Sequence, residues 1–149
     1  MLILAGCGGT AQEKGQVVRG GGFSFEAPVG WHVAVAGARA SASRDSELVQ
    51  VSTFPLQKPY TDALFDAVVK ELDARMQVLA KQVGGTVSDG GTVKAAGIRS
   101  HSYRVAVGSH VDEYTFVLRD KLEYQLLCRR KNSNGESVCR QLVKSFVPA

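Results

Sequence analysis

The stretch "EYTFVLRDKLEYQLLC" (residues 113–128) decides the fold, because hydrophobic and polar residues alternate along it on both sides of a short polar interruption. Alternation with a period of two is typical of β-strands, and the Arg-Asp-Lys run at residues 119–121 predicts a turn between two antiparallel strands. Within the first strand Tyr114, Phe116 and Leu118 are expected to point inward. Within the second strand Leu122, Tyr124, Leu126 and Cys128 are expected to share one face.

A third strand and a closing helix flank this hairpin. Upstream, residues 98–107 alternate in the same way, and Gly-Ser-His at residues 108–110 predicts a hairpin connection. Downstream, apolar residues recur at helical spacing near the C-terminus, which predicts an amphipathic helix. Its buried stripe is expected to consist of Cys139, Leu142, Val143 and Phe146.

The N-terminal half contains further strands. The segment "GFSFEAPVGWHVAV" (residues 22–35) predicts two short strands around a Pro-Val-Gly turn, and residues 47–54 predict another strand. In the strand after the turn, Trp31, Val33 and Val35 are expected to face the same way.

A long helix separates these strands from the C-terminal hairpins. Apolar residues recur at helical spacing over residues 60–83, and Gly84 is expected to end the helix. Three consecutive antiparallel strands between two helices predict an α+β fold, with a central antiparallel β-sheet in a single domain.

Composition excludes several classes of protein. The 149 residues carry 18 basic and 14 acidic side chains, so the net charge is only +4. The basic residues are scattered, which does not indicate nucleic-acid binding. No apolar stretch reaches the ~18 residues that a membrane-spanning helix needs.

The N-terminus suggests a lipid anchor. Residues 4–7 (Leu-Ala-Gly-Cys) resemble the lipobox of bacterial lipoproteins, in which the cysteine is lipidated and becomes the new N-terminus. We therefore expect residues 1–6 to be the remnant of a truncated signal peptide, Cys7 to carry the lipid, and residues 7–21 to form a flexible Gly-rich tether ahead of the domain at 22–149. The apolar run before Gly6 is shorter than a signal peptide requires, so a start recorded downstream of the true one, a trimmed chain or an accidental match remain alternatives.

The other two cysteines predict a disulfide. If Cys7 carries lipid, Cys128 and Cys139 make an even number, as expected in an oxidising compartment. Both face the layer between the last strand and the last helix, so a bridge between them is the favoured interpretation. Two buried thiols are the alternative. A metal site fits poorly, because no further ligands lie nearby in the sequence.

No motif predicts catalysis or a bound cofactor. His32, His101 and His110 show no metal-ligand spacing, and we expect His101 to be a partly buried ring with its hydrogen bonds satisfied. Neither a nucleophile elbow nor a phosphate-binding loop is present in the sequence, although a Ser-His-Asp triad could still assemble in space. The basic run "CRRKN" (residues 128–132) could hold an anionic lipid head group or a cell-wall polymer, or could be a solvated rim.

Several of these segments together resemble the PsbP-like superfamily. They are "FSFEAPVGW" at residues 23–31, the long helix, the hairpin described above and the closing "CRQLVKSF" at residues 139–146. The resemblance covers about residues 22–147 and implies an α/β/α sandwich with helices on both faces of the sheet, a fold shared with a yeast nuclear-import factor. It implies no reaction. The lipobox and the basic balance favour the branch of small bacterial lipoproteins of the LpqN type.

These observations lead to one expected function and one alternative. We expect a non-catalytic binding or accessory module, anchored through Cys7 to the extracytoplasmic face of the cell membrane and serving an envelope protein complex or a lipid-like ligand. The alternative is a carrier that holds a small lipid-like ligand in a pocket between the long helix and the sheet.

Overall fold

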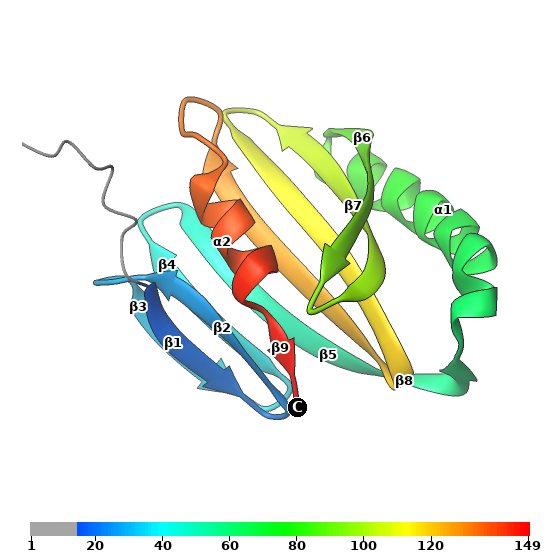
Figure 1. The fold of residues 1–149 in the computed structure, drawn as a ribbon. Helices are drawn as coiled ribbons and strands as arrows, with labels where there is room; N and C mark the ends of the chain where they lie inside the picture. Colours follow the sequence, from blue (N-terminus) through cyan, green and yellow to red (C-terminus); the bar gives the residue numbers. More distant parts are fainter. Residues whose placement is uncertain (1–14) are drawn as a thin grey trace, which may run out of the picture.

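The structure is a computed structural model that describes residues 15–149, so Cys7 lies outside the described residues. Figure 1 shows the arrangement of the strands and helices. The elements are β1 (Gly15–Gly20), β2 (Phe23–Pro28), β3 (His32–Ala36), β4 (Arg39–Arg44), β5 (Glu47–Tyr60), the 3-10 turn η1 (Asp62–Leu64), α1 (Phe65–Val83), β6 (Thr86–Ala95), β7 (Ile98–Val107), β8 (His110–Lys131), α2 (Ser137–Ser145) and β9 (Val147–Pro148).

The strands form two antiparallel sheets. The larger has the order β3-β4-β5-β8-β7-β6, and the smaller has the order β1-β2-β9. β8 folds back on itself near Asp120, whose φ is +53°, so its yellow and orange arms lie side by side in Figure 1. The N–H of Asn132, just beyond the second arm, donates to the carbonyl oxygen of Ser109 at 2.9 Å. The predicted turn at residues 119–121 is therefore confirmed.

Two clusters of buried side chains fill the core. One combines residues of α1 with β7 and the first arm of β8, and the other combines α2 with the small sheet, β4, β5 and both arms of β8. Neighbouring residues of β8 fall in different clusters, Phe116 with α1 and Val117 with α2, because successive strand residues point to opposite faces of a sheet.

The chain is mainly β-sheet and contains two α-helices within the described residues. The prediction of an α/β/α sandwich with helices on both faces of the sheet is not confirmed. On the face that α2 occupies, strands of the small sheet pack against the large sheet as well. Sequence periodicity locates helices well but gives no measure of how much of a sheet they cover.

The folded region begins earlier than predicted. Residues 15–20, assigned above to a flexible tether that runs to residue 21, form β1 and pair with β2 from Gly15 opposite Pro28 to Gly20 opposite Phe23. Val18 anchors the strand in the core, with 1% of its surface exposed. Alternation did not predict this strand because Val17 and Val18 are its only apolar side chains and glycines stand at both of its ends. The remainder of the predicted tether, residues 7–14, lies outside the described part of the chain.

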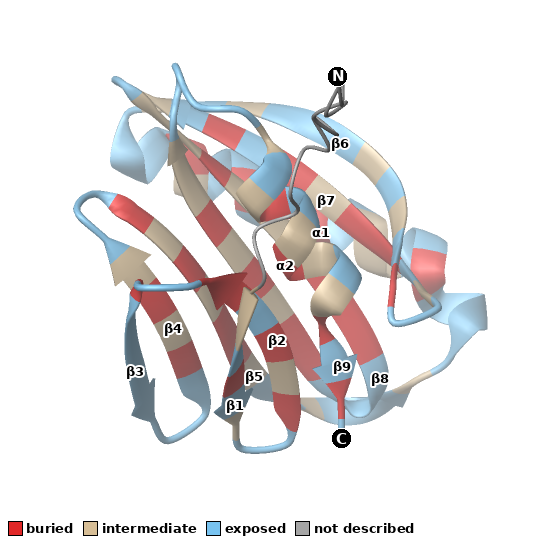
Figure 2. Ribbon diagram, turned by 60° about the vertical axis from the view of Figure 1, so that its left-hand side comes forward, coloured by how far each residue is buried: buried red, intermediate tan, exposed pale blue. Residues whose placement is uncertain are grey.

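β3 differs from its prediction as well. Trp31 is buried, but Val33 and Val35 are 37% and 53% exposed. β3 is an edge strand of the large sheet, and Figure 2 shows it in pale blue along the border of the molecule. Alternation predicted that these residues share a face, but it did not reveal that the layer which buries their β4 partners, Ala42 and Ala40, leaves the edge strand itself largely exposed.

The long helix has the predicted end and a later start. The segment from residue 60 first forms the end of β5 and then η1, and α1 starts at Phe65. Gly84 ends α1 in the left-handed conformation, with φ of +68°. No helix in the described region is long and apolar enough to cross a membrane.

Candidate functional site: an arginine-lined pocket

A pair of cysteines fixes α2 to the large sheet. The Sγ atoms of Cys128 in β8 and Cys139 in α2 lie 2.04 Å apart, which is the distance of a disulfide bond, and the Cα atoms lie 5.4 Å apart. The structure thus brings together the two cysteines that the sequence paired. Their linkage holds the first turn of α2 beside the end of β8.

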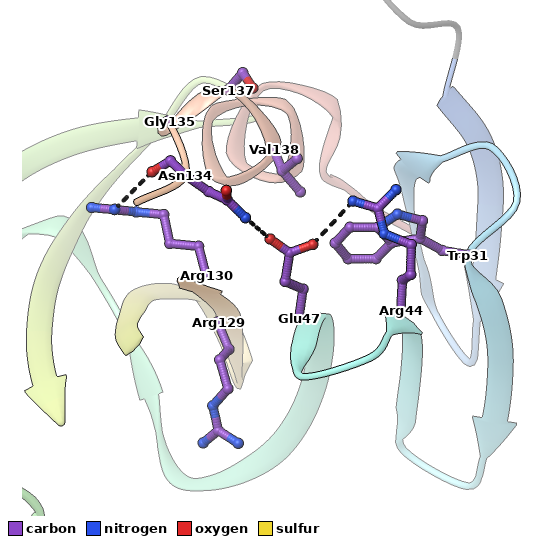
Figure 3. Close-up of a pocket in the computed structure, with 9 residues that line it drawn as sticks. All are labelled: Trp31, Arg44, Glu47, Arg129, Arg130, Asn134, Gly135, Ser137 and Val138. Atoms are coloured by element: carbon purple, nitrogen blue, oxygen red, sulfur yellow. Dashed lines mark hydrogen bonds and ion pairs between the residues drawn. The ribbon is translucent and has the colours of Figure 1, made fainter. Parts of the chain in front are cut away.

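A cavity of about 260 Å³ lies at this junction. Its wall comes from Trp31 ahead of β3, the end of β4, the start of β5, the end of β8, the loop that precedes α2 and the first turn of α2, as Figure 3 shows. We call it the arginine pocket. Its lining residues are Trp31, Arg44, Glu47, Arg129, Arg130, Asn134, Gly135, Ser137 and Val138.

Glu47 lies at the centre of one wall. Glu47 is 8% exposed, and its carboxylate accepts hydrogen bonds from Nη2 of Arg44 at 3.2 Å and from Nδ2 of Asn134. The guanidinium of Arg44 also lies over the ring of Trp31, 5.4 Å from its centroid, in a cation–π contact. Both carboxylate oxygens are therefore occupied by donors from the protein (Figure 3).

Arg129 has a full partner. Its Nε and Nη2 donate to the two carboxylate oxygens of Asp112 at 2.8 and 2.9 Å. This hydrogen-bonded pairing is the main reason why the pKa of Arg129 is raised above its ordinary value. Arg129 is thus a fixed, neutralised part of the wall.

Arg130 is less completely paired. Its side chain is only 12% exposed, and its Nη2 lies 3.9 Å from Glu113 and 3.7 Å from Glu136, beyond hydrogen-bond length. Arg104 holds both of these carboxylates more closely, at 2.8 Å each. Nη1 of Arg130 donates to the carbonyl oxygen of Asn134 at 3.3 Å, whereas its Nε is buried without a hydrogen-bond partner in residues 15–149.

The start of α2 adds further donors. Glu136 occupies the N-cap position and makes no capping hydrogen bond with its side chain. The first N–H groups of an α-helix have no partner within the helix. The groups of the pocket that still lack a hydrogen-bond partner are therefore mainly donors, which suits a ligand with acceptor oxygens.

A second group of polar side chains lies between α1 and the β6–β7 pair. Nε2 of His101, a residue only 6% exposed, is 2.7 Å from Oδ1 of Asp89. The hydroxyl of Tyr103 donates to Oδ1 of Asp73 at 2.5 Å. Burial, followed by this hydrogen bond, raises the pKa of Tyr103 well above its usual value.

Asp73, Asp89 and His101 could be considered as metal ligands, because one donor atom from each lies within 4.8 Å of the others. Nδ1 of His101, however, is buried without a partner among the described residues. Ligation through Nε2 would leave the ring proton on Nδ1 with no acceptor, whereas metal-bound histidines normally donate that proton to a neighbour. The geometry favours a hydrogen bond from Nε2 of His101 to Asp89.

The structure does not bring the other histidines or the serines to His101. His32 is exposed on β3, and Nε2 of His110 lies 3.8 Å from Asp112. The hydroxyls of Ser100 and Ser102 donate to backbone carbonyls of their own neighbourhood. A Ser-His-carboxylate triad around His101 is thus not formed in residues 15–149.

The sequence identified part of the pocket. Arg129 and Arg130 belong to the basic run singled out at residues 128–132, and the structure places them in the wall of the pocket. Arg44, Glu47 and Asn134 were missed, since no local pattern marks residues that meet only through the tertiary fold. The pocket also lies at α2, not between the long helix and the sheet.

Comparison with solved structures places the fold. The chain is similar to the cyanobacterial PsbP protein CyanoP of Synechocystis sp. PCC 6803, with a TM-score of 0.62, 17% identity, and coverage of 98% of this chain and 99% of the other. It is also similar to a structure from Bacteroides thetaiotaomicron VPI-5482, with a TM-score of 0.55 and 10% identity over 85% of this chain, but it spans only 45% of that protein. No protein-family model and no curated protein sequence matches the chain. The fold is PsbP-like.

Proposed function

We propose that this protein is a lipid-anchored, non-catalytic binding module of the bacterial cell envelope, and that its arginine pocket receives an acidic group of its ligand. In this proposal the chain belongs to the LpqN-type lipoproteins and is attached through Cys7 to the extracytoplasmic face of the membrane. The lipobox-like residues 4–7 support the anchor, and the pairing of Cys128 with Cys139 is typical of an oxidising compartment.

The buried Nε of Arg130 is the observation that carries the assignment of the pocket. A buried donor without an acceptor costs free energy, about 1–3 kcal/mol and more when the group is charged. Such a group is rare in folded proteins and points to a water, an ion or a ligand that satisfies it. Arg130 lines the cavity, so a ligand bound there that reaches Nε with an acceptor oxygen would satisfy this donor.

The size and chemistry of the pocket narrow the choice of ligand. About 260 Å³ is smaller than the roughly 300–1,000 Å³ of most sites for drug-sized ligands. Four of the nine lining residues are charged, and three of them are arginines. Arg44 and Arg129 are already paired with carboxylates, so Arg130 and the first N–H groups of α2 are the donors left for a phosphate or carboxylate group, and a wall this polar does not suit an acyl chain. An acidic head group with the rest of the ligand outside fits best.

The alternative of a carrier between the long helix and the sheet receives less support. Leu72 and Met76 of α1 are each 1% exposed and pack against side chains of β7 and β8. This layer is filled by ordinary core residues. The arginine pocket is therefore the better candidate for a binding site.

Binding of small acids tests the proposal. The full chain carrying Cys7→Ser is titrated calorimetrically with inorganic phosphate, acetate and dihexanoyl phosphatidic acid, which separate a phosphate site from a carboxylate site and a free anion from a lipid head group. We expect Arg130→Gln to weaken binding about tenfold or more, the effect of removing a charged hydrogen bond. Arg140→Gln, which removes an arginine 69% exposed on α2, is the matched control. Equal affinity in all three proteins would refute the pocket.

A further inference from the structure

The free edges of the two sheets differ in how they are protected. Edge strands expose unpaired backbone groups, and proteins usually protect them with charges, prolines, bulges or very short length. β6 has Asp89, Lys94 and an irregularity in pairing after Asp89; β1 has Arg19; and β9 is two residues long and ends in Pro148. β3 has none of these features.

The sequence of β3 is His-Val-Ala-Val-Ala, and all five residues are exposed. Figure 2 shows the strand along the border of the molecule with no other part of residues 15–149 beside its free edge. Exposed apolar side chains on an unprotected edge are a ready surface for pairing with another strand.

The register with β4 shows which backbone groups β3 leaves free. Ala36 lies opposite Arg39 and closes a two-residue turn in which Gly37 has φ of +59°. The closing pair of such a hairpin is hydrogen-bonded, and hydrogen-bonded pairs alternate with non-hydrogen-bonded pairs along antiparallel strands. The pairs Val33–Ala42 and Val35–Ala40 are therefore of the second kind. Consequently, the N–H and C=O groups of Val33 and Val35 point toward the free edge.

We propose that this edge pairs with β3 of a second copy of the chain, antiparallel and centred on Ala34. In this register Val33 lies opposite the partner's Val35 and exchanges two backbone hydrogen bonds with it, and Val35 does the same with the partner's Val33. The four valines meet on one side of the joined sheet. The two copies of Ala34 face each other as a non-hydrogen-bonded pair.

Self-complementarity of the strand identifies a second copy as the partner. The Val-Ala-Val segment reads the same in both directions, so one two-fold axis satisfies both valines of both copies at once. An axis at Val33 would place Val35 opposite Trp31, and an axis at Val35 would place Val33 opposite Gly37 in the turn. No charged residue lies in the strand to repel its copy.

The contact is small. Five residues from each copy bury less surface than the roughly 1,200–2,000 Å² of stable specific interfaces. We therefore expect a weak dimer, with a dissociation constant on the order of 0.1 mM for the free chain. Attachment of both copies to one membrane surface would raise their effective concentration.

Cross-linking tests the register. Ala34→Cys and Ala36→Cys are prepared in the full chain carrying Cys7→Ser, and dimers are measured by non-reducing electrophoresis after mild oxidation. In the proposed register the two copies of residue 34 have Cα atoms about 4.5 Å apart, whereas the two copies of residue 36 are about 14 Å apart. We expect at least a fivefold faster cross-link for Ala34→Cys. Equal rates, or faster cross-linking of Ala36→Cys, would overturn the register.

Sedimentation equilibrium tests the dimer itself. The same Cys7→Ser chain is measured at up to 1 mM, with Val35→Lys as the edge variant and Val78→Lys as the control. Val78 is a similarly exposed valine, 56% exposed, but lies on α1. We expect the average mass to rise with concentration for the parent and for Val78→Lys and to stay monomeric for Val35→Lys. A monomeric parent, or association unaffected by Val35→Lys, would overturn the proposal.

Discussion

Arg129 and Asp112 join the two arms of β8 through a pair of parallel hydrogen bonds, Nε to Oδ1 at 2.8 Å and Nη2 to Oδ2 at 2.9 Å. Asp112 is 5% exposed and lies on the first arm, whereas Arg129 lies on the second arm and lines the arginine pocket. The pair therefore links the register of the central hairpin to the shape of the pocket wall.

Breaking this pair from the arginine side should destabilise the protein. Arg129→Met leaves the Asp112 carboxylate buried without its main partner. We expect a loss of about 2 kcal/mol in the free energy of unfolding, less than for a fully buried pair because the Arg129 side chain is 39% exposed. Urea denaturation measures this loss. Arg119→Met is the control, since Arg119 and Asp120 are both largely exposed and lie 3.8 Å apart. Similar losses in the two variants would contradict the account.

The cysteine pair should stabilise the fold under oxidising conditions. A bridge between residues 11 apart in sequence lowers the entropy of the unfolded chain, which corresponds to about 3 kcal/mol. Cys139→Ser should therefore melt at a lower temperature than the parent in the absence of reductant. With reductant present the difference should be small. Identical melting curves for the parent with and without reductant would show that no disulfide forms.

Tyr103 should make stability depend on alkaline pH. The unfolded chain ionises a tyrosine near pH 10, whereas burial and the bond to Asp73 raise the pKa of Tyr103 in the folded protein. Its contribution to stability is thus complete below pH 10 and decreases as the pH rises above that value. We expect Tyr103→Phe to cost about 1–2 kcal/mol at pH 8 through the lost hydrogen bond, and the difference from the parent to narrow by pH 11. A constant difference across this range would argue against the raised pKa.

Cys7→Ser should release the protein from membranes. The folded region contains no helix capable of crossing a bilayer, so in the proposed function attachment depends on the lipid at residue 7. Cell fractionation with detection of the protein in the soluble and membrane fractions measures this. Ala5→Val, which keeps the cysteine but enlarges a small residue ahead of it, should delay processing. Full retention of Cys7→Ser in the membrane fraction would exclude the anchor.

Alternation of apolar and polar residues correctly predicted the buried residues of strands that other layers of the protein cover. Alternation placed Phe116, Tyr124 and Leu126 in the core, and the structure buries each of them. The same rule did not describe Val33 and Val35, because period alone reveals which residues share a face and not whether another layer covers it. β1 was missed, since its burial depends on a single valine between glycines.

The pocket was only partly predictable for a different reason. The basic run at residues 128–132 is visible in the sequence, but its environment depends on contacts between distant segments. Asn134 reaches Glu47 across 87 residues of sequence, and Asp112 reaches Arg129 across 17. The first pair forms only after β5 pairs with the second arm of β8, and the second only after β8 folds back on itself, so neither pair is marked by a local pattern at its own residues.

The signal of the Arg130 Nε–Hε group in a nitrogen–proton NMR spectrum tests the central claim most directly. The full chain carrying Cys7→Ser is titrated with inorganic phosphate at neutral pH, with the Arg130 signal assigned by its absence in Arg130→Gln. The account predicts that this signal and the Trp31 indole signal shift together and reach saturation, while the Arg140 signal moves little. An Arg130 signal that stays in place throughout the titration, or that moves without saturating in parallel with Arg140, would contradict an acid-binding pocket.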